Sequence, residues 1–176
     1  MTMYKEHIKP IVVLLIICLI IGGVLGAVNT VTAPIIEKNV KEAEEANYYA
    51  VLPEADTFTS VDVDIPGVKA ALKADNGAGY VVIAEAGGYN AAVPAAVSFS
   101  EDGKIKKVLM TENEETPGMG QKVRNDAFQD QFAGWDAAEI SLADIDAVSG
   151  ATISSRAAVN AINLAIQAYN KMKGGN

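Results

Sequence analysis

Residues 95–111, AAVSFSEDGKIKKVLMT, hold two short apolar stretches separated by a turn signal. The first ends at Val97–Ser100, the second covers Lys104–Met110, and the Glu-Asp-Gly sequence at 101–103 lies between them. An Asp-Gly pair between two such stretches is typical of a β-hairpin. We therefore predict a pair of antiparallel strands here.

Three more stretches of strand length precede this hairpin. They are TFTSVDVDI at 57–65, GVKAALKAD at 67–75 and GYVVIAEA at 79–86, and each is bounded by Gly, Asn, Asp or Pro. The connections between them are too short to hold crossover helices. The middle of the chain thus predicts a mainly antiparallel sheet.

The C-terminal part of the chain has the spacing of a helix, from about residue 153 to residue 173. Its apolar stripe recurs every three or four residues, at Val159, Ile162, Ile166 and Tyr169. A stripe of this kind packs against a core. Together with the strands, it predicts an α+β domain in which helices flank the sheet.

An uncharged stretch, IVVLLIICLIIGGVLGAV, occupies residues 11–28. At about 1.5 Å per residue its helix would span about 27 Å, close to the thickness of a bilayer core. A cleaved signal peptide is the competing interpretation, but Leu25-Gly26-Ala27 places a bulky residue where cleavage sites have a small one. We therefore divide the chain into an N-terminal segment 1–10, a transmembrane helix 11–28, a membrane-proximal helical segment 29–52 and a domain 53–176.

The basic residues that flank this stretch predict its orientation. Lys5 and Lys9 precede it, and the first basic residue after it is Lys38. Lysine and arginine stay on the cytoplasmic side of a bacterial-type span. We therefore expect a single-pass protein of the cell (inner) membrane, with residues 1–10 in the cytoplasm and the domain outside.

Composition excludes several classes of function. A net charge of −8 argues against nucleic acid as a partner. One cysteine and one histidine allow no internal disulfide, no thiolate-bound iron–sulfur cluster and no attached haem. No carboxylates cluster at metal-ligand spacing, so we predict no metal site. Redox chemistry in this chain would require an organic cofactor.

A stretch rich in hydroxyl groups, DAVSGATISS, precedes the C-terminal helix. Gly150 permits a turn and Ala151 adds little bulk, so Thr152 lies at or just before the first helical turn. Unpaired N–H groups and the helix dipole make such a position an anion site, to which Ser154 and Ser155 add donors. These neutral donors suit a singly charged phosphodiester. An ordinary N-cap at this threonine is the alternative.

A second loop, ETPGMGQK at 115–122, combines a rigid proline with two permissive glycines. Such a loop can bring backbone N–H groups against a flat ligand. Met119 would offer a soft apolar surface, and Lys122 a positive charge. A plain turn between the sheet and a helix is the alternative.

Together the two loops resemble the FMN-binding domain of the G subunit of the Rnf electron-transport complex. They are also similar to the related C subunit of the sodium-translocating NADH:quinone reductase. Residues 146–152 match the family's D-x-x-[ST]-G-A-T signature without departure. Residues 115–120 match its E-T-P-G-hydrophobic-G loop, with Met119 where leucine is usual. Residues 88–105 and 128–135 also fall where the family has similar runs.

The resemblance implies a covalently attached flavin. In that family a flavin transferase links FMN, through its phosphate, to the threonine hydroxyl of the signature, which is Thr152 here. It also implies that the transferase recognises Asp146, that residues 149–151 shape the attachment turn and that the 115–122 loop lies along the flavin ring. The expected FMN-binding residues are Glu115, Thr116, Gly118, Met119, Lys122, Ser149, Gly150, Ala151, Thr152, Ser154 and Ser155.

The function implied by the resemblance is that of an electron-transfer subunit, which is not an enzyme on its own. Its complex would couple electron flow between ferredoxin and NAD to the movement of Na⁺ or H⁺ across the membrane. Its partners would be the other membrane subunits and, during maturation, the flavin transferase. Two alternatives remain: a C-type subunit of the quinone reductase, whose chains tend to be longer, and a flavin-free membrane-anchored binding or scaffold domain.

Overall fold

A computed structural model describes the backbone of residues 2–174, and the side chains of residues 9–36 and 38–174. The chain forms two compact units, Met1–Glu44 and Glu45–Asn176. The side chain of Lys5, on which the predicted orientation partly depends, lies outside the described residues, as do residues 175 and 176 of the predicted domain.

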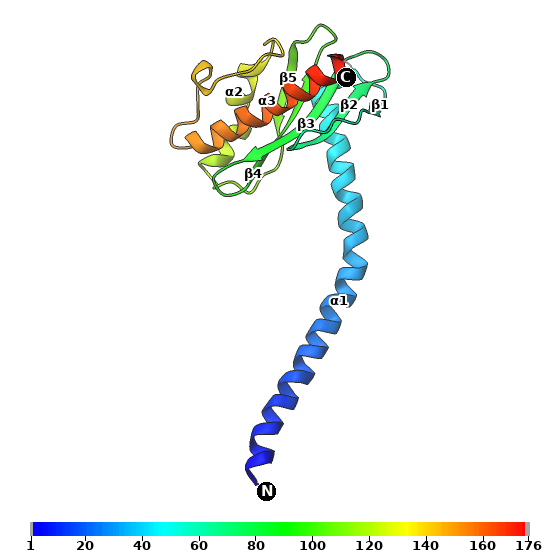
Figure 1. Cartoon of the computed structure of the whole chain (residues 1–176), viewed down its shortest axis with the longest axis vertical. Coiled ribbons are helices and arrows are strands. Elements are labelled where there is room, and N and C mark those ends of the chain that lie inside the picture. Colours follow the sequence, from blue (N-terminus) through cyan, green and yellow to red (C-terminus); the bar gives the residue numbers. More distant parts are fainter. Residues whose placement is uncertain (1, 175–176) are drawn as a thin grey trace. The chain divides into compact units, whose positions relative to one another are not determined.

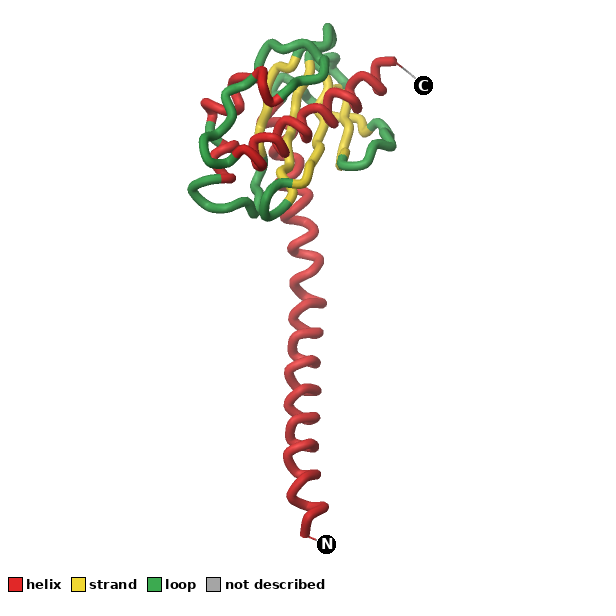
Figure 2. The backbone as a smooth tube through the Cα atoms, turned by 60° about the vertical axis from the view of Figure 1, so that its left-hand side comes forward, coloured by secondary structure: helices red, strands yellow, loops and turns green. Residues whose placement is uncertain are grey.

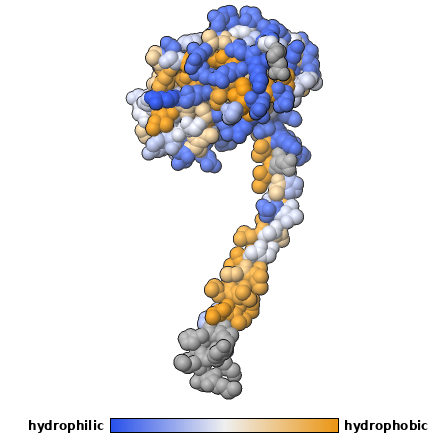
Figure 3. Space-filling model, viewed as in Figure 1, coloured by the Kyte–Doolittle hydropathy of each residue, from blue (hydrophilic) through white to orange (hydrophobic). Residues whose placement is uncertain are grey.

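The first unit consists of most of helix α1, Thr2–Val51. In the described residues, its Lys9–Val51 portion is the one helix long and apolar enough to cross a membrane, judged by length and composition. Large apolar side chains at successive positions of the 11–28 stretch are exposed, so they lie on every side of the helix; Figure 3 shows one such face in orange. A helix that is apolar on every face fits a lipid environment better than water. The helix ends at Val51, one residue before the end of the predicted 29–52 segment.

The second unit is built on a five-stranded sheet in the order β1-β2-β3-β4-β5, in which every neighbouring pair is antiparallel. The prediction of a mainly antiparallel sheet is therefore confirmed. The predicted hairpin forms between β4 and β5, with Ala95 opposite Met110 and Phe99 opposite Ile105. The strands are β1 (Phe58–Ser60), β2 (Val68–Ala74), β3 (Tyr80–Gly87), β4 (Ala92–Phe99) and β5 (Ile105–Met110).

Helix α3, Thr152–Gly174, lies across one face of the sheet, as Figures 1 and 2 show from two directions. Its predicted stripe is buried against side chains such as Val82 and Val97. In the sequence, three short 3-10 helices and α2 lie between β5 and α3, and they complete this layer. They are η1 (Gly120–Arg124), α2 (Asp126–Gln129), η2 (Asp130–Phe132) and η3 (Leu142–Asp144).

The opposite face of the sheet packs against the C-terminal end of α1. Val51 and the following Leu52 are buried with Val81 of β3 and Ala96 of β4. Because side chains alternate along a strand, the neighbouring strand residues, such as Val82, contribute to the α3 side instead. Both faces are therefore covered, and the strands carry few polar residues.

The last carbonyl groups of α1 are held by side chains of the sheet. The hydroxyl of Ser98, which is fully buried, donates to the carbonyl of Val51 at 2.7 Å. The ammonium of Lys107 donates to the carbonyl of Ala50 at 3.0 Å. These bonds satisfy carbonyls that a helix end leaves unpaired, and the positive charge suits the negative end of the helix dipole.

Candidate cofactor site

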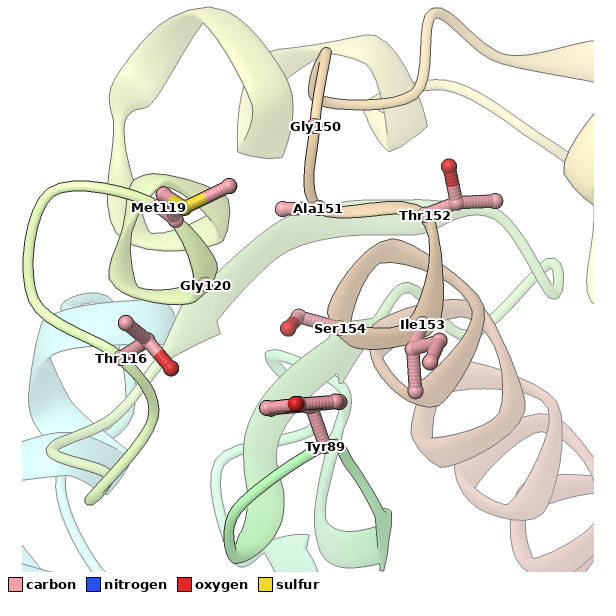
Figure 4. A pocket seen from close by; sticks show the side chains of 9 residues that line it. All are labelled: Tyr89, Thr116, Met119, Gly120, Gly150, Ala151, Thr152, Ile153 and Ser154. Atoms are coloured by element: carbon pink, nitrogen blue, oxygen red, sulfur yellow. The ribbon is translucent and has the colours of Figure 1, made fainter.

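A cavity of about 570 Å³ opens where three segments of the second unit meet. The segments are the β3–β4 turn, the loop before η1 and the beginning of α3, and Figure 4 shows their side chains around the opening. This volume falls in the range of about 300–1,000 Å³ that is typical of small-molecule sites. No charged side chain lines it. The lining residues are Tyr89, Thr116, Met119, Gly120, Gly150, Ala151, Thr152, Ile153 and Ser154.

The beginning of α3 leaves backbone donors free at this cavity. The N–H of Ser155 donates to the carbonyl of Ala151 at 2.9 Å, so Ala151 occupies the N-cap position and has no side chain that can cap. The N–H groups of residues 152–154 have no hydrogen-bond partner among the described residues. Three open N–H groups at a helix N-terminus form a site for an anion.

Thr152 is the first residue of α3, so it does not cap the helix. Its side chain is exposed, and its hydroxyl makes no hydrogen bond within the part of the chain that the structure describes. In Figure 4 it lies at the rim of the cavity and points away from Ser154 and Tyr89. An exposed hydroxyl therefore lies at the rim of the cavity, beside the open N–H groups.

Gly150 gives the chain the turn that leads into α3. Its φ is +77°, a conformation that residues with a side chain rarely adopt. A Cβ at this position would lie 3.2 Å from the terminal methyl carbon of Met119. The turn at Gly150 and the loop before η1 are therefore in close contact.

Glu115 lies behind the cavity wall and joins all three segments. Only 1 % of it is exposed. One carboxylate oxygen accepts hydrogen bonds from the backbone N–H groups of Asn90 (2.8 Å) and Ala91 (3.1 Å) in the β3–β4 turn. The other oxygen accepts a hydrogen bond from the hydroxyl of Ser154 in α3. We refer to this arrangement as the Glu115 bracket.

Two glycines leave room for the bracket. A Cβ at Gly88 or at Gly120 would lie 2.6 Å from a carboxylate oxygen of Glu115. Burial by itself raises the pKa of Glu115, but the hydrogen bonds from Ser154 and from the β3–β4 turn outweigh burial and hold the pKa below its usual value. The carboxylate is therefore charged at neutral pH.

Six of the residues expected to bind FMN line the cavity together. They are Thr116, Met119, Gly150, Ala151, Thr152 and Ser154. Glu115 is turned inward, and Ser155 is buried, where its hydroxyl accepts a hydrogen bond from the N–H of Val148 at 3.0 Å. Ser149 is exposed on the turn. Gly118 and Lys122 line a neighbouring hollow with Gln121, Arg124 and Asn125.

Asp146 stands apart from the cavity lining. Its backbone is held by Gln131, whose amide oxygen accepts from the Asp146 N–H at 2.7 Å. Its side chain is exposed and has no partner among the described residues. The Asp146 side chain is therefore accessible from solvent.

Sequence reasoning missed three lining residues: Tyr89, Gly120 and Ile153. Gly120 closes the matched 115–120 motif, and Tyr89 lies in the 88–105 run, so both were within matched stretches. Ile153 is apolar yet lies off the buried stripe of α3, and this mismatch could have marked it as a candidate for contact with a ligand.

Comparison with known proteins places these features in one family. Residues 88–167 match the family described as "FMN-binding domain". The chain is 30% identical to the G subunit of the proton-translocating ferredoxin:NAD(+) oxidoreductase complex of Clostridium ljungdahlii, covering 92% of this chain and 91% of that one. It is 27% identical to the G subunit of the Na(+)-translocating complex of Acetobacterium woodii, covering 96% and 94%.

The fold has a solved counterpart. The C subunit of the Na(+)-translocating NADH-quinone reductase from Parabacteroides distasonis superimposes with a TM-score of 0.51 at 20% identity, covering 62% of this chain and 63% of that one. This likeness supports the expected α+β architecture. It concerns the fold alone.

Proposed function

This chain belongs to the family of G subunits of ion-translocating oxidoreductase complexes, and we propose that it is an electron-transfer subunit that carries FMN linked through its phosphate to Thr152. The observation that carries the proposal is the beginning of α3. There, three N–H groups and an exposed hydroxyl, all without a hydrogen-bond partner among the described residues, meet at the cavity that the 115–120 loop completes.

The residues around Thr152 fit a phosphodiester. After attachment the phosphate carries one negative charge, which the open N–H groups and the helix dipole stabilise without a basic side chain. A triphosphate would need more positive charge than this lining offers. The apolar surfaces of Met119 and Ile153, at the same cavity, suit the flavin ring.

Attachment requires an activated flavin phosphate, such as a flavin dinucleotide, and a transferase. The oxygen of Thr152 forms a bond to phosphorus, the bond between that phosphorus and its leaving nucleotide breaks, and the hydroxyl proton passes to solvent. The chain therefore gains the mass of FMN less one water. The exposed side chain of Asp146 is the feature that we assign to recognition by the transferase.

A covalent link retains the cofactor at a surface where a dissociable flavin would be lost to dilution. When bound, FMN supplies the electron transfer, while the protein orients the ring and tunes its potential. We further propose that α1 anchors the chain in the cell membrane, with the domain outside, and that the partners are the other subunits of a ferredoxin:NAD⁺ oxidoreductase complex.

Thr152→Val tests the attachment site. In cells that express a flavin transferase, we expect the native chain to show flavin fluorescence after denaturing electrophoresis and the variant to show none, because valine has the same shape but no hydroxyl. Thr152→Ser restores a nucleophile and should recover fluorescence.

Thr111→Val is the matched control, since it removes a threonine hydroxyl outside the cavity lining. It should load flavin like the native chain. A fluorescent Thr152→Val band would contradict the proposed site.

A further inference from the structure

The large exposed apolar side chains that follow α1 in the chain gather at one place. Beyond α1, the large apolar residues that the structure describes as exposed are Tyr89 (71 %), Met119 (48 %) and Ile153 (54 %), and all three line the cavity. Exposed apolar groups that cluster around a hollow indicate a ligand or a partner that covers them.

Tyr89 lies in a turn whose backbone is held by several hydrogen bonds. The N–H of Gly88 donates to the carbonyl of Ala91 at 2.9 Å, and the turn is tied to Glu115 by the bracket. The side-chain amide of Asn90 also donates to the carbonyl of Glu114 at 2.7 Å. The Tyr89 hydroxyl, by contrast, has no partner among the described residues. Hydrogen bonds therefore fix the backbone around Tyr89, while its hydroxyl makes none among the described residues.

The ring of Tyr89 faces the cavity. Figure 4 shows it edge-on, with Ser154 and Ile153 beside it and one face turned toward the space below Ala151. Met119 extends from the other side of the same space. A flat, apolar ligand between these surfaces would cover the exposed area of both.

We propose that Tyr89 stacks against the isoalloxazine ring of the FMN and, through the Glu115 bracket that fixes its turn, sets the position of that ring. The inference rests on the proposed function, because it assigns a contact to the same cofactor. An isoalloxazine tethered at Thr152 fits these surfaces better than a protein partner does, since the tether holds it in the cavity that they line.

Stacking has two measurable consequences. A tyrosine ring in contact with a flavin quenches its emission, because the phenol lends an electron to the excited flavin and recovers it without net chemistry. The electron-rich face of an aromatic ring also disfavours negative charge on a stacked neighbour, so it lowers the reduction potential of the flavin.

The test uses the full-length protein, co-expressed with a flavin transferase and purified in detergent. Tyr89→Leu should carry FMN at Thr152 in the native proportion, while the emission of the bound flavin rises severalfold and its midpoint potential increases. Tyr89→Phe keeps the ring but is a poor electron donor, so emission should rise while the potential stays near native. Tyr49→Leu, which removes another exposed tyrosine, should change neither.

Native emission in both Tyr89 variants, with FMN attached, would overturn the inference. So would unchanged emission accompanied by loss of assembly with the other subunits, which would assign the ring to a protein contact. If Tyr89→Leu fails to load flavin, Tyr89→Phe alone decides. Failure of the proposed function looks different, because then the native chain itself carries no FMN.

Discussion

The C-terminal end of α1 and the N-terminal end of α3 differ in whether their backbone groups are hydrogen-bonded. The C-terminal end of α1 is closed by the domain itself, since Ser98 and Lys107 bind the carbonyls of Val51 and Ala50. The N-terminal end of α3 is open, with Ala151 in the capping position and three N–H groups unpaired among the described residues. An open end costs stability unless water or a ligand satisfies it.

The helices of the second unit differ in how they begin. η1, α2 and η2 have no side-chain cap, whereas η3, a helix of three residues, has a complete capping box, in which Ser141 and Asp144 bond each other's backbone N–H groups. The 23-residue α3 could have had the same arrangement. Instead, α3 begins with Gly-Ala-Thr at the cavity, and the proposed function assigns its open first turn to the flavin phosphate.

The largest expected effect on stability comes from removing the support beneath the open end. Glu115→Ala leaves the N–H groups of Asn90 and Ala91 and the hydroxyl of Ser154 without their buried acceptor, at a cost of about 3 kcal/mol in the free energy of unfolding. Urea unfolding of the full-length protein in detergent measures it. The exposed neighbour gives the control: Glu114→Ala should cost under about 0.5 kcal/mol. Equal costs would mean that the bracket contributes nothing.

Removing a hydrogen bond at the C-terminal end of α1 should lower stability by a smaller amount. Ser98→Ala removes the buried hydroxyl that binds the Val51 carbonyl, so the free energy of unfolding should fall by about 1–2 kcal/mol. Flavin attachment should be unchanged, because the cavity is not involved. Ser60→Ala, at an exposed position of β1, should leave stability at the native value. A native-like Ser98→Ala would show that this helix end needs no cap.

Capping the N-terminal end of α3 should raise the free energy of unfolding instead of lowering it. Ala151→Ser places a capping oxygen at the beginning of α3, which should raise the stability of the flavin-free protein by about 0.5–1 kcal/mol. The same oxygen competes with a phosphate for the N–H groups, so flavin loading should decline. Ala147→Ser, at an exposed position, should change neither quantity. Increased stability with undiminished loading would separate the open N–H groups from the cofactor.

The smallest expected effect on stability comes from lowering the pH. The pKa of Glu115 is lowered below 4.5, because its hydrogen bonds outweigh the effect of burial, so the unfolded chain takes up the proton first as pH falls. Its contribution to stability is complete above about pH 4.5 and declines as the pH approaches the folded-state pKa. As the pH falls below about 4.5, the native protein should lose more stability than Glu115→Gln. Parallel pH profiles of unfolding would argue against a charged bracket.

The sequence predicts local features of this fold well. The Asp-Gly turn at 101–103 and the flanking apolar stretches predicted the β4–β5 hairpin, and the spacing from Val159 to Tyr169 predicted α3. Each depends on residues close together in the chain. Three residues of the 115–120 motif, Thr116, Met119 and Gly120, line the cavity.

The sequence could not predict which way the side chains of that loop turn. Glu115 was expected beside the flavin, but its partners are 24 to 39 positions away in the chain, and they draw it inward. Tyr89 was overlooked for the same reason, because its turn is held by those distant contacts. No local pattern records such long-range hydrogen bonds.

The central claim, that the open end of α3 carries FMN on Thr152, is tested most directly by mass. The intact full-length chain would be weighed after expression with and without a flavin transferase, and its peptides mapped. We predict a gain equal to FMN less one water, only with the transferase, on the peptide that contains Thr152. An unmodified chain despite an active transferase, or a flavin on another residue, would contradict the account.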